Sequence, residues 1–175
     1  CEATGADIKE VSKAVGTDSR IGDKFLNAGP GFGGSCFKKD ILNLVYLCRF
    51  YGLNEVASYW ENIVNINYWQ QKRIAEIVIK NLFGTISEKK IAILGFSFKS
   101  NTNDTRESPS INISKDLIQE DAKLAFYDPR VNKKQIIAEL QTNSNTFSFE
   151  VCESALEACR NSDAVIVLTE WEEFK

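Results

Sequence analysis

The sequence contains no histidine. This absence excludes Ser-His-Asp and Cys-His catalysis, as well as HExxH and Cys-His zinc sites, unless another segment or another chain supplies the imidazole. Cysteine is present in an odd number and without C-x-x-C spacing, at Cys1, Cys36, Cys48, Cys152 and Cys159. Such a set fits reduced intracellular thiols better than a disulfide framework or a zinc site. We therefore expect no metal site, and we expect Cys48, within LVYLCRF, to belong to the core.

An excess of positive charge and a long apolar run are also missing. The net charge is −3, whereas a nucleic acid or a membrane surface as the main partner would require a basic field. No apolar run is long enough to cross a bilayer, and the N-terminus lacks a signal-type hydrophobic segment. We therefore expect a cytoplasmic protein with neither nucleic acid nor membrane as a partner.

The first half of the chain has the apolar periodicity of helices. Residues 2–15 carry apolar side chains at roughly helical spacing, and Gly16 stands where that helix is expected to end. Residues 37–50 predict a second helix, and a long amphipathic run predicts a third over about 54–83. This third run carries more apolar surface than one small partner would cover. It is either the core of an internal bundle or a helix that joins two domains and pairs with its twin in a dimer.

The period changes after Gly84. Strands are predicted by KKIAILGFSF, AKLAFYDP and DAVIVLTEW, and helices by residues 108–121, 132–141 and 153–162. Such alternation predicts a parallel sheet, so we expect an α/β protein in which an all-helical domain over residues 1–84 precedes a parallel-sheet domain over residues 85–175. The chain starts at Cys1 without methionine and stops just after a strand, so we expect a piece of a larger protein with a truncated sheet.

The stretch GPGFGGSCFKKD, residues 29–40, matches G-x-G-x-x-G through Gly29, Gly31 and Gly34. A Rossmann fingerprint also needs a preceding strand, and an acidic residue about twenty positions later. The preceding RIGDKFLNA carries no clear strand, and the helix predicted over 37–50 occupies the place of the second strand. A P-loop would need Lys-Ser or Lys-Thr after the last glycine. Neither nucleotide motif is therefore favoured.

Cys36 directly follows these glycines, at the start of a predicted helix. With Ser35 as the N-cap, Cys36 would occupy the first helical position, where the helix dipole favours a thiolate. Lys38 and Lys39 add positive charge, and Lys39 and Asp40 share a helix face with Cys36. The pattern suits an activated nucleophile beside a carboxylate that could orient or deprotonate water. The alternative is a structural cysteine buried at a helix start.

A second polar loop, GFSFKSNTNDTRESPS over residues 95–110, follows a predicted strand. Ligands of parallel sheets bind at the carboxyl ends of strands, where Lys99 and Arg106 would lie. Two cations, several hydroxyl groups and a helix start near Ser108 suit a phosphorylated ligand. The alternative is a solvated surface loop.

Together the two loops carry a specific resemblance. GFGGSCFKKD followed by AILGFSFKSNTNDTRESPS resembles the UDP-glucose 6-dehydrogenase family, and CEATGADIKEV, FYDPRV and AVIVLTEW extend the similarity over nearly the whole chain. The eukaryotic members are the most similar. The resemblance implies a Rossmann-like UDP-binding fold for residues 85–175 and a dimerisation role for the helical domain. It also implies two NAD-dependent oxidations of the C6 hydroxyl of UDP-glucose, which yield UDP-glucuronate.

The resemblance further implies residue roles, position by position. Cys36 would be the nucleophile that forms a thiohemiacetal and then a thioester, and Asp40 would assist with water or proton transfer. Arg20 would reach the substrate of a neighbouring subunit. Asn27 departs from the lysine expected in the animal enzymes, which removes a charge contact. The other implied substrate contacts are Gly31, Phe32, Gly33, Phe98 and Lys99, and the implied cofactor contacts are Cys36, Lys39 and Arg106.

Other parts of the family pattern are missing from these residues. The N-terminal NAD-binding domain is absent, as are the last strands of the UDP-binding domain. We therefore expect no dehydrogenase activity from this chain alone. The alternatives are a related dehydrogenase of GDP-mannose or a UDP-amino sugar, which would share the cysteine loop, and a non-catalytic nucleotide-sugar-binding or dimerisation module.

Overall fold

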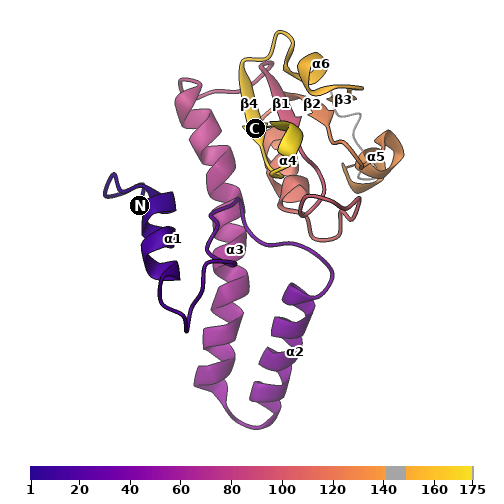
Figure 1. Ribbon diagram of the computed structural model, residues 1–175. Coiled ribbons are helices and arrows are strands. Elements are labelled where there is room, and N and C mark those ends of the chain that lie inside the picture. The colour runs from indigo at the N-terminus through magenta and orange to yellow at the C-terminus, as the bar shows by residue number, and fades with distance from the viewer. Residues whose placement is uncertain (141–148, 175) are drawn as a thin grey trace.

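The computed structural model describes residues 1–140 and 149–174, which form a helical half and an α/β half. The helical half contains α1 (Ile8–Gly16), α2 (Phe37–Phe50) and α3 (Asn54–Asn81). The α/β half contains β1 (Lys90–Leu94), α4 (Pro109–Gln119), β2 (Lys123–Tyr127), α5 (Lys133–Leu140), β3 (Phe149–Val151), α6 (Ala155–Cys159), β4 (Ala164–Val167) and the 3-10 helix η1 (Glu172–Phe174). Figure 1 shows α3 extending beside both halves, with α2 along its lower part and the α/β half beside its upper part.

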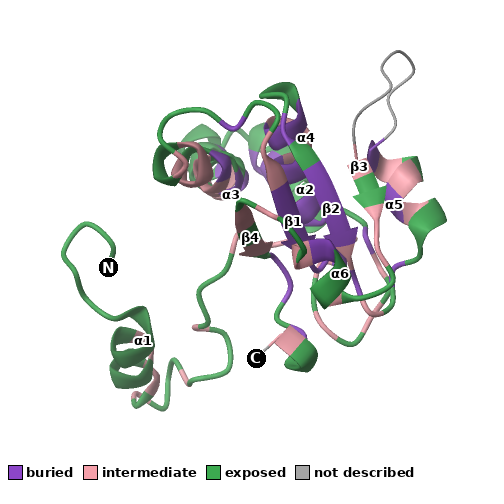
Figure 2. Cartoon of the chain, turned by 90° about the horizontal axis from the view of Figure 1, so that it is seen from above, coloured by how far each residue is buried: buried purple, intermediate pink, exposed green. Residues whose placement is uncertain are grey.

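The four strands form one parallel sheet in the order β3-β2-β1-β4. Because successive side chains of a strand point to opposite faces, Ile91 and Ile93 join the core shared with α3, α4 and α5. Ala92 and Leu94 instead pack with Ala158 of α6 on the other face. Figure 2 shows β1 and β2 as mostly buried strands. The predicted α/β fold, with helices followed by a parallel sheet, is confirmed.

Helices α2 and α3 form a hairpin with its own core. Ile41, Val45 and Cys48 of α2 pack against Ala57 and Val64 of α3, and Cys48 is only 7% exposed, which confirms its predicted place in the core. Gly52, between the helices, has a φ of +76°, a conformation that favours glycine at a helix C-terminus. This hairpin gives α2 a fixed position relative to α3.

The C-terminal half of α3 packs against the α/β core instead. Ala75 belongs to the buried cluster that contains β1 and α4, and Ile74, Val78, Ile79 and Leu82 pack against that cluster. One helix thus contributes to the core of both halves. The domain boundary between residues 84 and 85 stays a prediction.

Several element boundaries differ from the predicted ones. The first helix begins at Ile8 rather than at residue 2, because Asp7 is extended and its carboxylate accepts a hydrogen bond from Lys9 N at 2.7 Å, which caps the helix there. The helix predicted over 153–162 is only the five-residue α6, with Ser154 as its N-cap. The last strand ends at Val167. Capping residues therefore set the starts of these two helices, which periodicity alone did not locate.

Strand β3 was not predicted. It has three residues and pairs with β2 at the edge of the sheet, so it carries too short a pattern to be recognised by alternation. Gln141, the last residue of the helix predicted over 132–141, and Lys175, the last of the predicted second domain, lie outside the described residues. Within the part of the chain that the structure describes, no helix combines the length and the hydropathy needed to cross a membrane.

Candidate active site

The glycine loop that precedes Cys36 is docked onto the loop between β1 and α4. Gly34 N donates a hydrogen bond to the carbonyl oxygen of Arg106 at 2.8 Å. The φ of Gly34 is +89°, and a Cβ atom on it would lie 2.9 Å from Cε2 of Phe98. Only glycine combines this conformation with this proximity. Glycine at position 34 therefore allows the two loops to pack closely together. No strand precedes Gly34 among the described residues, as expected for a loop that is not a Rossmann fingerprint.

An ion pair reinforces this contact between the two loops. Lys38 Nζ, in the first turn of α2, lies 2.7 Å from Glu107 Oε2. Partial burial opposes the charged form of Lys38, but hydrogen bonds to Glu107 and Tyr68 outweigh it and raise the pKa of Lys38. Gly33 packs against the backbone of Glu107 from the other side, with no room for a side chain. The two loops that the sequence singled out are thus one site.

Cys36 lies at the N-cap position of α2, with its side chain exposed. The prediction that Ser35 is the N-cap and Cys36 the first helical residue is wrong by one position. The backbone of Cys36 already has helical angles, φ −102° and ψ −53°, but regular helix starts at Phe37 and no side chain caps it. Ser35 Oγ instead lies 3.6 Å from Cys36 Sγ. The thiol therefore lies at the N-terminus of α2, where no side chain caps the amide groups of the first turn.

Charged groups surround this thiol. Lys39 Nζ lies 3.0 Å from Asp40 Oδ1, and this hydrogen bond raises the pKa of Lys39, with a smaller contribution from the charge of Cys36. Arg106 forms a two-pronged pair with Asp104, which raises the pKa of Arg106 and lowers that of Asp104. Cys36 also interacts electrostatically with Arg106. The structure thus brings the predicted nucleophile, carboxylate and two cations to one exposed edge.

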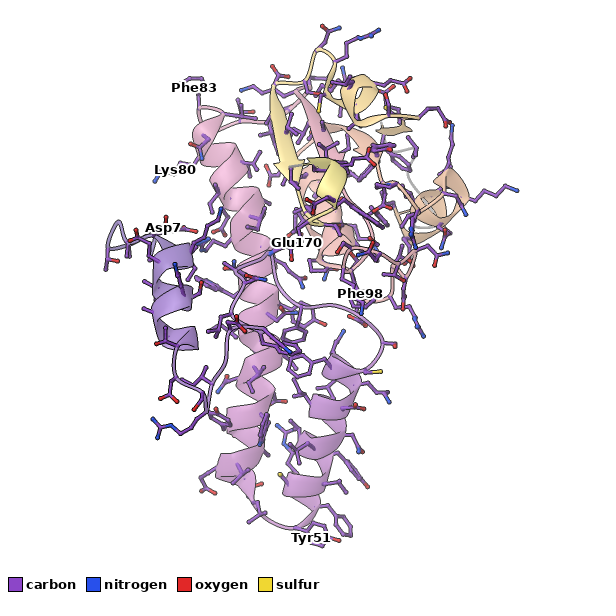
Figure 3. The ribbon with its side chains drawn as sticks, in the orientation of Figure 1. Asp7, Tyr51, Lys80, Phe83, Phe98 and Glu170 are labelled. Carbon is purple, nitrogen blue, oxygen red and sulfur yellow. The ribbon has the colours of Figure 1, made fainter. Side chains whose placement is uncertain are left out.

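A cavity of about 320 Å³ lies beside the docked loops. Its walls come from the glycine loop, the β1–α4 loop and the end of β4, and they include Asn27, Gly31, Phe98, Lys99 and Thr169. Figure 3 labels Phe98 and Glu170, which both line the cavity, at the side of the α/β half that lies toward α2 and α3. The cavity is at the carboxyl ends of parallel strands, where ligands of such sheets bind. Its size suits a small-molecule ligand.

Asp128, at the end of β2, fixes the loop that carries Phe98 and Lys99. Its Oδ2 accepts hydrogen bonds from Phe96 N at 2.7 Å and Ser97 N at 3.1 Å, and also from Ser97 Oγ and Trp171 Nε1. Its Oδ1 accepts from the amides of Arg130 and Val131. The carboxylate is buried and engaged by these donors, so it acts as an anchor of the loops at this edge of the sheet.

Three of the predicted substrate contacts do not line the cavity: Gly33, which packs against Glu107, and the side chains of Phe32 and Arg20. Phe32 packs against the α2–α3 core, with its ring 4.6 Å from that of Phe37 in an edge-to-face arrangement. Arg20 lies on an exposed turn, where its guanidinium pairs with Asp18 at 2.6 Å. The pairing raises the pKa of Arg20 and lowers that of Asp18. Neither side chain is among the residues that line the cavity.

Sequence reasoning missed several residues of the site. Thr169 lines the cavity, and its Oγ1 donates a hydrogen bond to Ser97 O at 2.6 Å. Its position just after a predicted strand was a usable signal. Asn67 of α3 holds the backbone of Phe32, and it interrupts an otherwise mostly apolar helical stripe, which was a weaker signal. The role of Asp128 had no signal beyond its place at a strand end.

Comparison with known proteins agrees with this arrangement. The family model for the central domain of the UDP-glucose/GDP-mannose dehydrogenase family matches residues 1–69. The model for the UDP binding domain of the same family matches residues 92–175. The two matches cover the cysteine loop and the β1–α4 loop, respectively. The segments that the structure docks against each other therefore belong to two domains of one family.

Individual relatives support the same assignment. The chain is 52% identical to the UDP-glucose 6-dehydrogenase of Gallus gallus, over 100% of this chain and 37% of that protein, and 52% identical to that of Caenorhabditis elegans, over 99% and 37%. A solved UDP-glucose dehydrogenase from Pyrobaculum islandicum superposes with a TM-score of 0.84 at 30% identity, over 98% of this chain and 38% of that one. The chain thus spans little more than a third of these relatives. With both domain models and these relatives in agreement, the chain belongs to the UDP-glucose/GDP-mannose dehydrogenase family.

Proposed function

We propose that this chain is the central and UDP-binding part of an NAD-dependent UDP-glucose 6-dehydrogenase. Residues 1–84 would form the helical domain that carries the cysteine loop and the long connecting helix, and residues 85–175 the UDP-sugar-binding domain. The observation that carries the proposal is the docking of the Cys36 loop onto the β1–α4 loop through Gly34 and Arg106, beside a cavity at the carboxyl ends of the strands. This contact joins a reactive group to a nucleotide-binding edge.

The cavity suits the substrate on chemical grounds. Lys99 lies at its wall and would neutralise phosphate charge, and the hydroxyl and amide groups of Ser100, Thr169 and Asn27 could orient a sugar or a ribose. The Phe98 ring is held against Gly34, so a pyrimidine or a hexose would meet a fixed apolar surface. The proposed substrate is UDP-glucose, because the relatives at about 50% identity are named for that sugar nucleotide.

Part of an NAD site fits the exposed edge around Cys36. Lys39 and Arg106 would supply positive charge toward the cofactor, although each is paired with a carboxylate, Asp40 or Asp104. NAD, when bound, would supply the hydride acceptor for each oxidation. The described residues contain no strand–glycine loop–helix unit of the dinucleotide type at residues 29–34. We therefore place only an edge of the cofactor site in this chain.

Cys36 and Asp40 would divide the remaining chemistry. After the first oxidation, the Cys36 thiolate would add to the C6 aldehyde, and the alkoxide formed would take up a proton to give a thiohemiacetal. Loss of the C6 hydride to the cofactor and of the hydroxyl proton to solvent would then give a thioester. Water would then attack the thioester carbon, with Asp40 accepting a proton from that water, and the products would be UDP-glucuronate and the free thiolate. The exposure of Cys36 and Asp40 supports this proposal, because both substrate and water can reach them.

The proposal is tested by the yield of NADH per UDP-glucose from the intact enzyme. We expect two NADH per sugar, and we expect Cys36→Ser to abolish the second oxidation or to slow it by at least about a hundredfold, because an unactivated hydroxyl is a far weaker nucleophile than a thiolate. Cys1→Ser is the matched control, since Cys1 is also exposed but lies outside the site, and it should retain full activity. The 175-residue chain by itself should be inactive in the same assay.

Other outcomes would point elsewhere. Turnover of GDP-mannose or a UDP-amino sugar, but not of UDP-glucose, would assign the protein to a sibling enzyme. No turnover with any of these sugars would leave a nucleotide-sugar-binding or dimerisation module. Equal activity of Cys36→Ser and the unmodified enzyme would reject the covalent role of Cys36 even if UDP-glucose proved to be the substrate.

A further inference from the structure

Three carboxamide side chains of α3 face the loop that walls the cavity. Asn67, Gln70 and Gln71, here called the carboxamide cradle, lie within five consecutive residues of that helix. Asn67 Oδ1 accepts a hydrogen bond from Phe32 N at 2.8 Å, and Asn67 Nδ2 donates one to Phe32 O at 3.0 Å. Gln70 Nε2 donates to Gly29 O at 3.2 Å. The cradle thus binds the backbone of the glycine loop at two separate points.

The burial of the cradle shows that these contacts are not incidental. Asn67 is 8% exposed and Gln71 is 3% exposed, within a buried stripe of α3 that otherwise consists of Ala57, Val64 and Ala75. A buried carboxamide destabilises a protein unless it is hydrogen-bonded, so apolar residues would be the simpler choice for packing alone. The polar residues occur where the loop crosses the helix. The two hydrogen bonds between Asn67 and Phe32 therefore fix the path of the loop at that point.

The loop also lies so close to the cradle that position 31 has no room for a side chain. A Cβ atom on Gly31 would lie 2.6 Å from Asn67 Oδ1 and 3.4 Å from Gln71 Cγ, and the φ of Gly31 is +128°. The backbone of the loop therefore rests directly on the two carboxamides. Displacement of the loop by even a fraction of an ångström would change hydrogen bonds to Asn67.

The cradle reaches the second half of the site as well. Gln71 Oε1 accepts a hydrogen bond from Asn112 Nδ2 of α4 at 2.8 Å. Helix α4 begins directly after the β1–α4 loop, with Ser108 as its N-cap. Gln71 therefore lies between the glycine loop and the helix that follows the other wall of the cavity. The same turn of α3 therefore contacts both the glycine loop and the helix that follows the β1–α4 loop.

We propose that Asn67, Gln70 and Gln71 are positioning residues that set the distance between the glycine loop and the β1–α4 loop, and so determine the affinity for the nucleotide sugar. The inference rests on the proposed function, because it takes the cavity between these loops as the substrate site. None of the three side chains lines that cavity, so Asn67 and Gln70 act through the loop backbone and Gln71 acts through Asn112 of α4. Loss of the cradle should weaken substrate binding more than it slows the chemical steps.

The test is the steady-state kinetics of Asn67→Ala in the intact enzyme. We expect KM for UDP-glucose to rise by about tenfold or more, because two hydrogen bonds are lost, and kcat to change by less than about threefold, because Cys36 lies beyond the held segment. Asn81→Ala is the matched control: Asn81 is on the same helix and also donates one side-chain hydrogen bond, to Ile77 O, but it is exposed and remote from the loop. Its KM should be unchanged.

Asn67→Leu separates positioning from packing. Leucine fills the volume but cannot hydrogen-bond, so thermal stability should recover relative to Asn67→Ala while KM stays high. If KM recovers with stability, or if Asn67→Ala leaves KM within twofold of the unmodified enzyme, the inference is wrong. If the Asn67 variants do not fold, Gln70→Ala decides in the same way, with an expected rise in KM of about threefold.

Failure of the inference and failure of the proposed function are distinguishable. An unmodified enzyme that does not oxidise UDP-glucose refutes the proposed substrate, and the same variants and control are then measured with the nucleotide sugar that is oxidised. An active unmodified enzyme whose KM is insensitive to Asn67 refutes only the role of the cradle.

Discussion

At the scale of single residues, Cys36 and Cys48 show how differently one side-chain type is used in this chain. Cys36 is exposed at the start of α2, near Lys39 and Arg106, whereas Cys48 is buried about three turns further along the same helix. Cys48 packs in the α2–α3 core. The difference in solvent access predicts a difference in reactivity between the two thiols.

We expect iodoacetamide to alkylate Cys36 at least about tenfold faster than Cys48 near neutral pH, because the reagent reaches the exposed thiol of Cys36 but not the buried thiol of Cys48. The measurement is a time course of peptide masses from the intact enzyme after quenching. Cys36→Ser should leave the rate at Cys48 unchanged. Equal rates at the two cysteines would contradict both the burial of Cys48 and the access to Cys36.

At the scale of elements, the ends of the parallel strands organise the site. Asp128 follows β2 and collects backbone donors from the segment after β1 and from its own turn, and it also accepts from Trp171 after β4. One carboxylate therefore fixes the ends of three neighbouring strands. The loop that presents Phe98 and Lys99 starts from this fixed point.

Asp128→Asn should destabilise this edge by about 2 kcal/mol, because an NH2 group would replace one of the two accepting oxygens. In one orientation of the amide, the NH2 group faces the donors of Phe96 and Ser97. In the other orientation, it faces the amides of Arg130 and Val131. Thermal unfolding should show a lower Tm, and hydrogen exchange should quicken in peptides that cover residues 95–100. Asp121→Asn is the matched control, because Asp121 is exposed and its positive φ of 60° suits asparagine. A Tm equal to that of the control would show that the carboxylate is not an anchor.

Element types were largely predictable, and element ends were not. The run KIAIL in β1 and the apolar spacing of α3 are strong local patterns, so their types and positions were predicted from sequence. The start of α1 depends on a cap at Asp7, and β3 exists because β2 offers it a pairing edge. A helix cap depends on a single hydrogen bond, and the pairing of an edge strand depends on a partner far away in the sequence. Neither feature therefore produces a periodic pattern in the sequence.

At the scale of the whole molecule, α3 packs against both the α2 helix and the α/β half. Its first half packs on α2, its middle carries the cradle, and its last turns pack on the sheet. Its remaining surface is strongly apolar: the exposed aromatic and aliphatic residues of α2 and α3 include Tyr46, Phe50, Tyr59, Ile66 and Trp69. An apolar surface of this extent is typical of a protein–protein interface.

We propose that this surface, along α3, pairs with that of a second copy of the chain. Tyr59→Glu should weaken the association of the intact enzyme by at least about tenfold, because the interface would bury an unpaired charge. Sedimentation velocity over a range of concentrations measures the change. Leu156→Glu, on α6 and 83% exposed, is the control and should not alter the association. An unchanged mass distribution for Tyr59→Glu would place the subunit interface elsewhere.

The sequence by itself determined the succession of helical and α/β parts, the two loops and the residue types that could carry the chemistry, because periodicity, glycine content and charge are local properties. Only the tertiary structure decided that Gly34 lies against Phe98, that Asn67 and Gln70 hold the loop backbone, and that Asp128 is an anchor. These contacts join segments more than thirty residues apart. Their geometry depends on how the helices and the sheet pack together, and a one-dimensional pattern contains no distance between such segments.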